Sequence, residues 1–311
     1  MIAWLALGAI IFLVAVYLGI GALAAGQLTR PKRTFDASLG PASRGLPYED
    51  LRIPARGDGL QIAAWYIPSG ENRRAIILVH GRDNSRTNGF VDQFVIFAGA
   101  LRDAGFPVMM IDLRGHGQSA DSRYYFGIRE RRDILGAVDW LQGLGHQPGS
   151  IGVLGYSLGA ASVIGAASEE PAIGAIWIDS AYADIKTVIE GSWKVESGLP
   201  LAFLHSTRLM ARLLYGFDFT ASRPVDEIGR IPPRPIFMTY CRRDPMVRIA
   251  HCDRLLAAAP SAQTWIIDNC DQHTLPVDIV PEKYNHHALG YNLHPADYTA
   301  KVIGFFDSSL R

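Results

Sequence analysis

The chain has 311 residues, and its 30 Lys and Arg balance its 30 Asp and Glu, so the formal net charge is zero. This balance, without a long basic run, argues against a nucleic-acid-binding protein, and a hydrophobic fraction of 49% excludes a disordered chain. Three cysteines, Cys241, Cys252 and Cys270, do not make a disulfide framework, and they form no CxxC pair that would indicate zinc. The composition therefore predicts a globular protein.

An uncharged apolar segment opens the chain at residues 2–25. It is longer than the roughly 20 residues that cross a hydrocarbon core of about 30 Å. A cleaved signal peptide is the competing interpretation, with Ala22-Leu23-Ala24 as its cleavage site, but the segment lacks the basic residues that begin such a signal. We therefore predict a transmembrane anchor over residues 1–26.

The residues that follow the anchor predict its orientation. Arg30, Lys32 and Arg33 come directly after the span, and the positive-inside rule then places the downstream domain in the cytoplasm. Residues 27–47 contain Pro, Gly and Ser and are predicted to be a linker that tethers the domain over residues 48–311.

Short apolar runs alternate with amphipathic segments through this domain. Residues 51–54 and 61–67 flank a Gly57-Asp58-Gly59 turn and predict an antiparallel hairpin. Near-continuous apolar runs, which are typical of strands buried on both faces of a parallel sheet, lie at residues 75–79, 108–111, 151–154, 175–178, 236–240 and 264–267. Helices are predicted near residues 90–104, 129–141, 158–167 and 247–258. This alternation predicts an α/β fold with a mostly parallel, doubly wound sheet.

Residues 181–235 interrupt the alternation, because they contain many apolar residues but no clear strand. They are either one ordinary crossover helix with core-facing padding or a small helical cap over the carboxyl edge of the sheet. A cap of this kind would bind an apolar acyl group on its inner face.

The motif Gly155-Tyr156-Ser157-Leu158-Gly159 carries the clearest chemistry. It follows a predicted strand and precedes a predicted helix, which is the setting in which G-x-S-x-G presents a nucleophilic serine on a strained turn. The helix directs its first N–H groups at an oxyanion formed there, so we predict Leu158 as one backbone donor. The loop after the strand at residues 75–79 is expected to supply the second, and Arg82 is the candidate. His80, beside it, is predicted to be a structural hydrogen-bonding residue.

A serine nucleophile needs a base, and the base needs an acid to orient it. Asp244 follows the strand at residues 236–240, where a carboxylate reaches the catalytic edge of the sheet; helix capping is its alternative role. Candidates for the base are His287, His273 and His286. No tight ligand spacing among these histidines supports a metal site.

In order and setting, these residues resemble the α/β-hydrolase superfamily, where the nucleophile, acid and base follow one another as Ser157, Asp244 and a histidine do here. Further landmarks are His80-Gly81, the loop from Asp112 to Ser119, and Asp179-Ser180-Ala181-Tyr182. The resemblance is strongest to a bacterial serine-hydrolase group with esterase, monoacylglycerol-lipase-like and serine-aminopeptidase-like members, several of them anchored at the N-terminus. It covers residues 48–311.

In that group the final histidine is followed by Tyr and Pro at the spacing of His287, Tyr291, Pro295 and Tyr298, so the resemblance implies that His287 is the base. An insertion over residues 274–286 departs from the pattern and keeps His273 as the alternative. Asp112, Glu130 and Asp133 are interpreted as structural.

The sequence thus predicts a membrane-anchored serine hydrolase that cleaves a lipid-like or aryl ester through an acyl-enzyme, without a cofactor. A serine peptidase or thioesterase would use the same residues, and a catalytically silent membrane-tethered binding protein is the alternative of another class.

Overall fold

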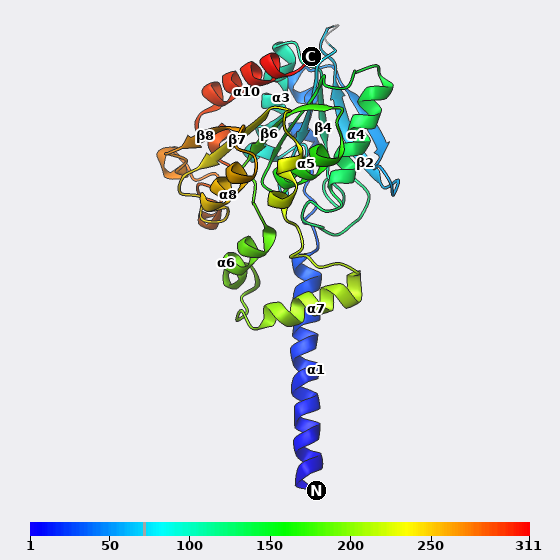
Figure 1. Ribbon diagram of the computed structural model, residues 1–311, viewed down its shortest axis with the longest axis vertical. Coiled ribbons are helices and arrows are strands. Elements are labelled where there is room, and N and C mark those ends of the chain that lie inside the picture. The colour runs from blue at the N-terminus through cyan, green and yellow to red at the C-terminus, as the bar shows by residue number, and fades with distance from the viewer. Residues whose placement is uncertain (71–72) are drawn as a thin grey trace.

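The protein is described by a computed structural model that covers residues 1–70 and 73–311. Within these residues one sheet of eight strands has the order β1-β2-β4-β3-β5-β6-β7-β8 (Figure 1). The strands are β1 (Glu49–Pro54), β2 (Gln61–Ile67), β3 (Ala75–Val79), β4 (Val108–Ile111), β5 (Ile151–Tyr156), β6 (Ile173–Asp179), β7 (Ile236–Cys241) and β8 (Gln263–Ile267). β1 and β2 form an antiparallel hairpin, β2 is antiparallel to β4, and the remaining neighbours are parallel. The predicted fold class and the predicted hairpin are confirmed.

Each face of the sheet has its own core, because alternate residues of a strand point to opposite faces. Ile77 and Val79 of β3 belong to the core beneath α4 (Arg131–Gly143), α5 (Leu158–Glu169) and α8 (Ala250–Ala258). Ile76 and Leu78 belong to the other core, beneath α3 (Phe94–Asp103) and α10 (Pro295–Ser309). All five residues of β3 are buried, which is why its sequence is an unbroken apolar run.

The predicted helix at residues 90–104 is divided in the structure into α2 (Gly89–Asp92) and α3. Phe90, Val91 and Asp92 have positive φ angles of 47°, 49° and 64°, which a continuous helix does not allow. The ring of Phe90 stacks on Tyr156 and on Tyr291, each at 4.9 Å between centroids. This tertiary packing overrides the helical pattern of the local sequence.

Residues 181–235 form two helices, α6 (Ile185–Ser197) and α7 (Phe203–Tyr215), that project from the sheet on the side of α1 (Ile2–Leu28) (Figure 1). This segment is called the cap below, and α7 crosses α1 below the domain. A four-residue helix α9 (Gly290–Leu293) and short 3-10 turns complete the chain, the latter at Ala37–Leu39, Pro41–Arg44, Pro224–Asp226, Ile228–Arg230, Gln272–Thr274 and Glu282–Tyr284.

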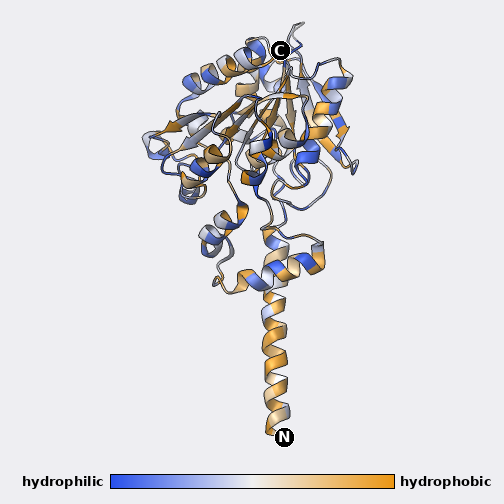
Figure 2. Ribbon diagram, viewed as in Figure 1, coloured by the Kyte–Doolittle hydropathy of each residue, from blue (hydrophilic) through white to orange (hydrophobic). Residues whose placement is uncertain are grey.

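α1 is 27 residues long and apolar enough to cross a membrane, and most of it is exposed and hydrophobic (Figure 2). The segment after it is bonded to the domain rather than loose. The backbone N–H of Lys32 donates to Asp83 at 2.8 Å, and the guanidinium of Arg33 donates to the carbonyl of Ser119.

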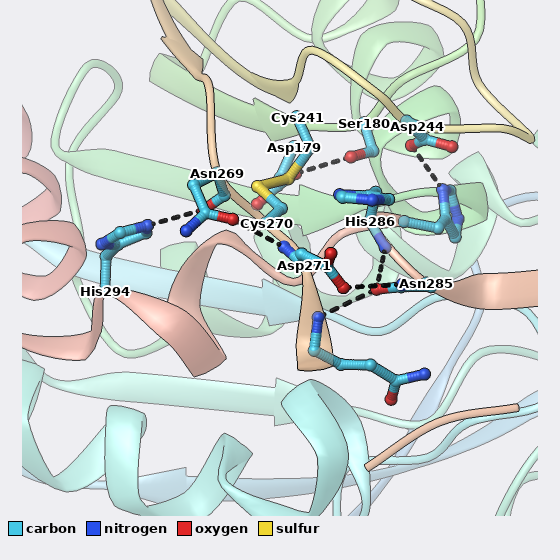
Figure 3. The surroundings of a disulfide bond; sticks show 12 residues. Asp179, Ser180, Cys241, Asp244, Asn269, Cys270, Asp271, Asn285, His286 and His294 are labelled. Carbon is cyan, nitrogen blue, oxygen red and sulfur yellow. Dashed lines mark hydrogen bonds and ion pairs between the residues drawn. A yellow bond between two sulfur atoms is a disulfide. The ribbon is translucent and has the colours of Figure 1, made fainter. Parts of the chain in front are cut away.

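A disulfide joins Cys241, the last residue of β7, to Cys270, in the loop after β8 (Figure 3). The three cysteines of the sequence predict no disulfide framework and no particular pair, so this bond corrects that expectation. The two residues, 29 positions apart, come together because β7 and β8 are neighbours in register, with Cys241 opposite Ile267. Both are buried, and Cys252 is a buried free thiol.

Candidate active site

Ser157 lies between the end of β5 and the start of α5 with φ 53° and ψ −120°, a strained conformation for a residue with a side chain. Two close approaches explain the flanking glycines. A Cβ on Gly155 would lie 2.7 Å from the carbonyl carbon of Gly159, and a Cβ on Gly159 would lie 2.5 Å from the carbonyl oxygen of His80. The turn can therefore form only with glycine on both sides of the serine, as the motif predicts.

His287 lies between Ser157 and Asp244. Its Nε2 is 2.9 Å from the Ser157 Oγ, and its Nδ1 is 2.8 Å from Oδ2 of Asp244. The other Asp244 oxygen accepts the backbone N–H groups of Met246, at 2.8 Å, and Val247, at 2.9 Å. The carboxylate is thus held in a turn after β7 with one oxygen free for the imidazole.

Electrostatics favour a charged imidazole at this position. Burial alone lowers the pKa of His287, but the adjacent Asp244 carboxylate outweighs it and raises this pKa above its ordinary value. A second buried carboxylate, Asp179 at the end of β6, lies close enough to interact with His287. Burial raises the pKa of Asp179 to about 6, against hydrogen bonds from Ser180 and Tyr298 that favour its charged form.

His273, the alternative base, lies elsewhere. It is exposed, and its two ring nitrogens contact Asp278, at 2.9 Å, and Glu282, at 3.0 Å. The structure therefore brings His287 to the serine and leaves His273 in the loop around the insertion.

Hydrogen bonds join the two ends of the insertion over residues 274–286. Asn285 accepts the backbone N–H of Gln272 at 2.9 Å and donates to Asp271 at 2.9 Å (Figure 3). The side-chain oxygen of Gln272 accepts the N–H groups of Ile279 and Val280. These contacts bring the two ends of the insertion together, so it leaves the position of His287 undisturbed. His286 beside it has a φ of 66° and makes no contact with the serine.

The two predicted oxyanion donors border the same cavity as the serine. Leu158 is the first residue of α5, and Arg82 follows the end of β3 after His80 and Gly81. In the described part of the chain, neither backbone N–H has a hydrogen-bond partner. The Arg82 side chain turns to the cap, where it pairs with Glu196 of α6 at 2.7 Å. This ion pair was not foreseen, because nothing in the sequence relates the two residues.

The cavity beside Ser157 has a volume of about 390 Å³, within the range of small-molecule sites. Its wall is mainly apolar. Ile185, Val188 and Ile189 of α6 contribute from the cap, and Ile279 and Val280 contribute from the insertion. The cap and the insertion therefore shape the space next to the nucleophile.

The other landmarks have structural partners. Asp112 forms a buried ion pair with Arg86, and Asp133 pairs with Arg114 at 2.7 Å. His80 accepts the N–H of Leu113 at 3.0 Å. Glu130 accepts the N–H groups of Tyr125, at 2.6 Å, and Gly127, at 2.9 Å. Over residues 1–70 and 73–311, no group of three or more His, Cys, Asp or Glu side chains is arranged to hold a metal ion.

Tyr298 is a residue of this region whose contact the sequence did not reveal. Its hydroxyl donates to Asp179 at 2.9 Å and accepts from the indole N–H of Trp177 at 3.2 Å. Its spacing from His287 was part of the resemblance, but only the fold shows that it bonds a carboxylate beside the candidate site.

Two uncharacterised Mycobacterium tuberculosis proteins, from strains CDC 1551 / Oshkosh and ATCC 25618 / H37Rv, are each 31% identical over 140 residues, which cover 43% of this chain and 47% of the relative. The match thus spans about half the length of these relatives.

Two solved structures are similar in fold. The Pyrococcus furiosus esterase Pf2001 has a TM-score of 0.70 at 22% identity, with 91% of this chain and 99% of that chain covered. A Mycobacterium tuberculosis puromycin-hydrolyzing peptidase has a TM-score of 0.62 at 16% identity, with 85% and 39% covered. The sequence model of the Alpha/beta hydrolase family matches residues 76–286, about two thirds of the protein. The chain therefore belongs to the alpha/beta hydrolase family.

Proposed function

We propose that the protein is a serine hydrolase that cleaves a carboxylic ester through an acyl-enzyme intermediate. The observation that carries this proposal is the continuous set of contacts from Ser157 Oγ through the His287 ring to Asp244. Nucleophile, base and orienting acid in this arrangement are what acyl transfer requires.

In the first half of the proposed reaction, His287 Nε2 takes the Ser157 proton as Oγ attacks the ester carbonyl. The carbonyl oxygen becomes an oxyanion between the N–H groups of Leu158 and Arg82. His287 then gives the proton to the departing alkoxide, the C–O bond breaks, and the acyl group remains on Ser157. In the second half, a water molecule loses a proton to His287 and attacks the acyl carbon, and the returned proton restores the serine hydroxyl as the acid leaves.

The apolar wall of the cavity supports an ester with a hydrophobic acyl or aryl group as the substrate. A serine peptidase or a thioesterase would need the same three residues, and the similarity in fold to a puromycin-hydrolyzing peptidase keeps the peptidase as the second candidate. A catalytically silent binding protein would not require the serine contact with His287.

The proposal includes attachment to the membrane through α1, supported by its length and exposed apolar surface. Two features bear on orientation, and they favour opposite sides. Arg30, Lys32 and Arg33 after the span favour a cytoplasmic domain. The disulfide favours an oxidising compartment. We propose that the domain lies on the cytoplasmic side, as the basic residues after α1 predict. The redox state of the two disulfide cysteines in cells tests this orientation.

Labelling with a fluorophosphonate probe tests the reaction. The full chain in detergent micelles is expected to gain one probe adduct by intact mass, and Ser157→Ala and His287→Ala are expected to lose it. His273→Ala, a matched histidine in an exposed loop, is expected to label like the wild type. No adduct on folded wild type would contradict the proposal and favour the binding protein, and loss in His273→Ala would contradict the assignment of the base.

The type of bond that is cleaved is tested on protein that reacts with the fluorophosphonate probe. Matched p-nitrophenyl esters, thioesters and aminoacyl p-nitroanilides of equal chain length are compared by kcat/KM. The ester is expected to be preferred, with a preference for longer acyl chains, and a preference for the anilide would replace the esterase with the peptidase.

A further inference from the structure

The cap exposes an unusual share of the apolar surface of the protein. Among the described residues that follow α1, nine large hydrophobic side chains are exposed, and five of them lie within residues 195–214 of the cap. They are Val195, Leu201, Leu209, Leu213 and Leu214. Such a concentration of exposed apolar side chains in one segment indicates an interaction site rather than ordinary scatter.

α7 packs directly against α1 through a hydrogen bond, a contact between two rings and a close helix crossing. The Tyr17 hydroxyl donates to the carbonyl of Ala202 at 2.6 Å, and the rings of Tyr17 and Phe203 are 5.2 Å apart. At the crossing point the helices touch through Gly21, where a Cβ would lie 2.6 Å from the Ser206 Oγ. The position of α7 along α1 is therefore fixed.

That position coincides with one end of a membrane span. From Ile2 to Gly21 the helix rises about 30 Å at roughly 1.5 Å per residue, which equals the thickness of a hydrocarbon core. Most of α1 before Gly21 is exposed, and Gly21 is its first buried residue. When α1 spans a bilayer, α7 thus crosses it where hydrocarbon gives way to headgroups.

The buried and exposed sides of α7 suit a helix that lies at the surface of a bilayer. Leu204, Thr207 and Ala211 are buried against the protein. Leu209 and Leu213, one turn apart on the opposite side, are 45% and 68% exposed. His205 and Arg212 are exposed beside them, and polar side chains that border an apolar stripe are typical of helices that lie in a membrane interface.

A second cavity, of about 440 Å³, extends from this level to the catalytic cavity. Ile20, Leu23 and Ala24 of α1 line one part of it. Lys32, Arg82, Asp83 and Tyr284 line both this cavity and the one that contains Ser157. An amphiphile at the bilayer surface would meet apolar α1 residues first and charged residues next to the nucleophile.

We infer that α7 is a second membrane-binding element, an interfacial helix whose Leu209 and Leu213 side chains contact the lipid surface and hold the mouth of the catalytic cavity at headgroup level. The partner is the bilayer itself, because α7 packs across α1, whose exposed apolar side chains are proposed to span it. The inference rests on the proposed membrane anchor, and it places the ester substrate among molecules that partition into lipid.

Site-specific fluorescence in nanodiscs of phosphatidylcholine tests the contact in the full chain. A single cysteine is introduced by Leu213→Cys and labelled with NBD; Cys252 is buried and the other two cysteines form the disulfide. Leu144→Cys is the matched control, because Leu144 is 53% exposed but follows α4 and precedes β5, at the edge of the sheet away from the site. Phe12→Cys reports on α1.

We expect lipids with a spin label near the headgroup to quench NBD at position 213 and to leave position 144 unquenched, and lipids with a spin label deep in the acyl chain to quench NBD at position 12. Quenching at position 12 without quenching at position 213 would overturn the inference while the anchor stands. No quenching at position 12 would contradict the anchor and the inference together. An NBD blue shift at position 213 without lipid quenching would mean that a second copy of the chain covers the leucines, and would also overturn it.

Activity supplies an independent readout. For Leu209→Ser/Leu213→Ser, hydrolysis of a long-chain ester dissolved in the bilayer is expected to fall about tenfold, because two side chains lose lipid contact. Hydrolysis of water-soluble p-nitrophenyl acetate by this double variant is expected to be unchanged. The control Leu144→Ser is expected to hydrolyse both substrates like the wild type. An equal loss on both substrates would indicate damage to the site and contradict the inference.

Discussion

At the residue scale, two opposing effects act on the pKa of the His287 imidazole. Burial disfavours its protonated form, whereas the carboxylate of Asp244 at 2.8 Å favours it and prevails. In the proposed mechanism only the neutral ring can take the Ser157 proton. The activity is therefore expected to be lost as pH falls through the raised pKa of His287.

Replacing Asp244 with Asn reverses the balance at His287. Without the Asp244 carboxylate, burial lowers the pKa of the ring against the smaller opposing effect of Asp179, so the acid limb of the kcat/KM profile is expected to move to lower pH. The maximal rate is expected to fall about 10⁴-fold, since the imidazole is no longer held and charge-stabilised. A pH–rate series on soluble ester measures both effects. An unmoved acid limb would show that another group governs it, and Asp278→Asn, next to His273, is expected to leave the profile unchanged.

Tyr298 is expected to stabilise the fold beside the site rather than to act on substrate. Tyr298→Phe leaves one Asp179 oxygen and the Trp177 indole N–H without their hydrogen-bond partner in a buried setting. We expect a loss of about 1–3 kcal/mol in the free energy of unfolding, with kcat nearly unchanged. Urea denaturation and ester hydrolysis measure the two quantities; a large loss of kcat with normal stability would contradict this role.

Individual residues differ in how far sequence could specify them. Ser157 was predictable because the glycine spacing encodes a local turn, whose close approaches lie within a few residues and at His80. His287 was harder, because four histidines crowd the end of the chain and only the closure of the insertion through Asn285 and Asp271 decides which one reaches the serine. The pairing of Arg82 with Glu196 needs the cap in place, and no local pattern encodes it.

At the element scale, the disulfide connects the two segments that deliver the acid and the base. Cys241 lies three residues before Asp244, and Cys270 begins the loop that leads through Asn285 to His287 (Figure 3). Removing the bond leaves each segment held only by its own hydrogen bonds.

Compared with purified wild type that has been oxidised to close this disulfide, the Cys241→Ser/Cys270→Ser variant is expected to be less stable by roughly 3–4 kcal/mol, the chain-entropy value for a closed loop of this length. We also expect kcat to fall more than KM rises, because the bond positions acid and base but borders no substrate. Chemical denaturation and steady-state kinetics test this, with Cys252→Ala as the control for loss of a buried sulfur. Unchanged stability would mean that the bond is not formed in the purified protein.

Elements with a strong period were predictable, and those defined by distant contacts were not. β3 and β4 have the predicted bounds because their apolar runs are buried on both faces of the sheet. The break at Phe90 escaped prediction because it depends on Tyr156 and Tyr291, which come from other parts of the chain. The crossing of α1 and α7 depends in the same way on residues about 185 positions apart.

At the scale of the whole molecule, the basic flank of α1 and the disulfide give opposite indications of which side of the membrane the domain occupies. When whole cells are lysed directly into denaturant that contains excess maleimide, Cys241 and Cys270, which are buried in the folded protein, are expected to be modified without prior reduction if the domain is cytoplasmic, since reducing conditions there keep thiols free. Denatured samples, alkylated with and without prior reduction, are compared by peptide mass. Protection that disappears only after reduction would place the domain on the oxidising side and reject the proposed orientation.

In the proposed membrane-anchored protein, the close contact of Gly21 with Ser206 also limits how α1 can adapt to bilayers of different thickness. A single helix can normally slide or shift to match the bilayer around it, but a helix held at one point by a crossing partner cannot. Hydrophobic mismatch in a thicker or thinner membrane would then be taken up by tilt of α1. Because the domain is bonded to the end of α1 through Lys32 and Arg33, such tilt would lift or lower the mouth of the cavity. The chain length of the lipids would thereby control how easily a substrate reaches Ser157. It would also sort the enzyme among membranes of different thickness.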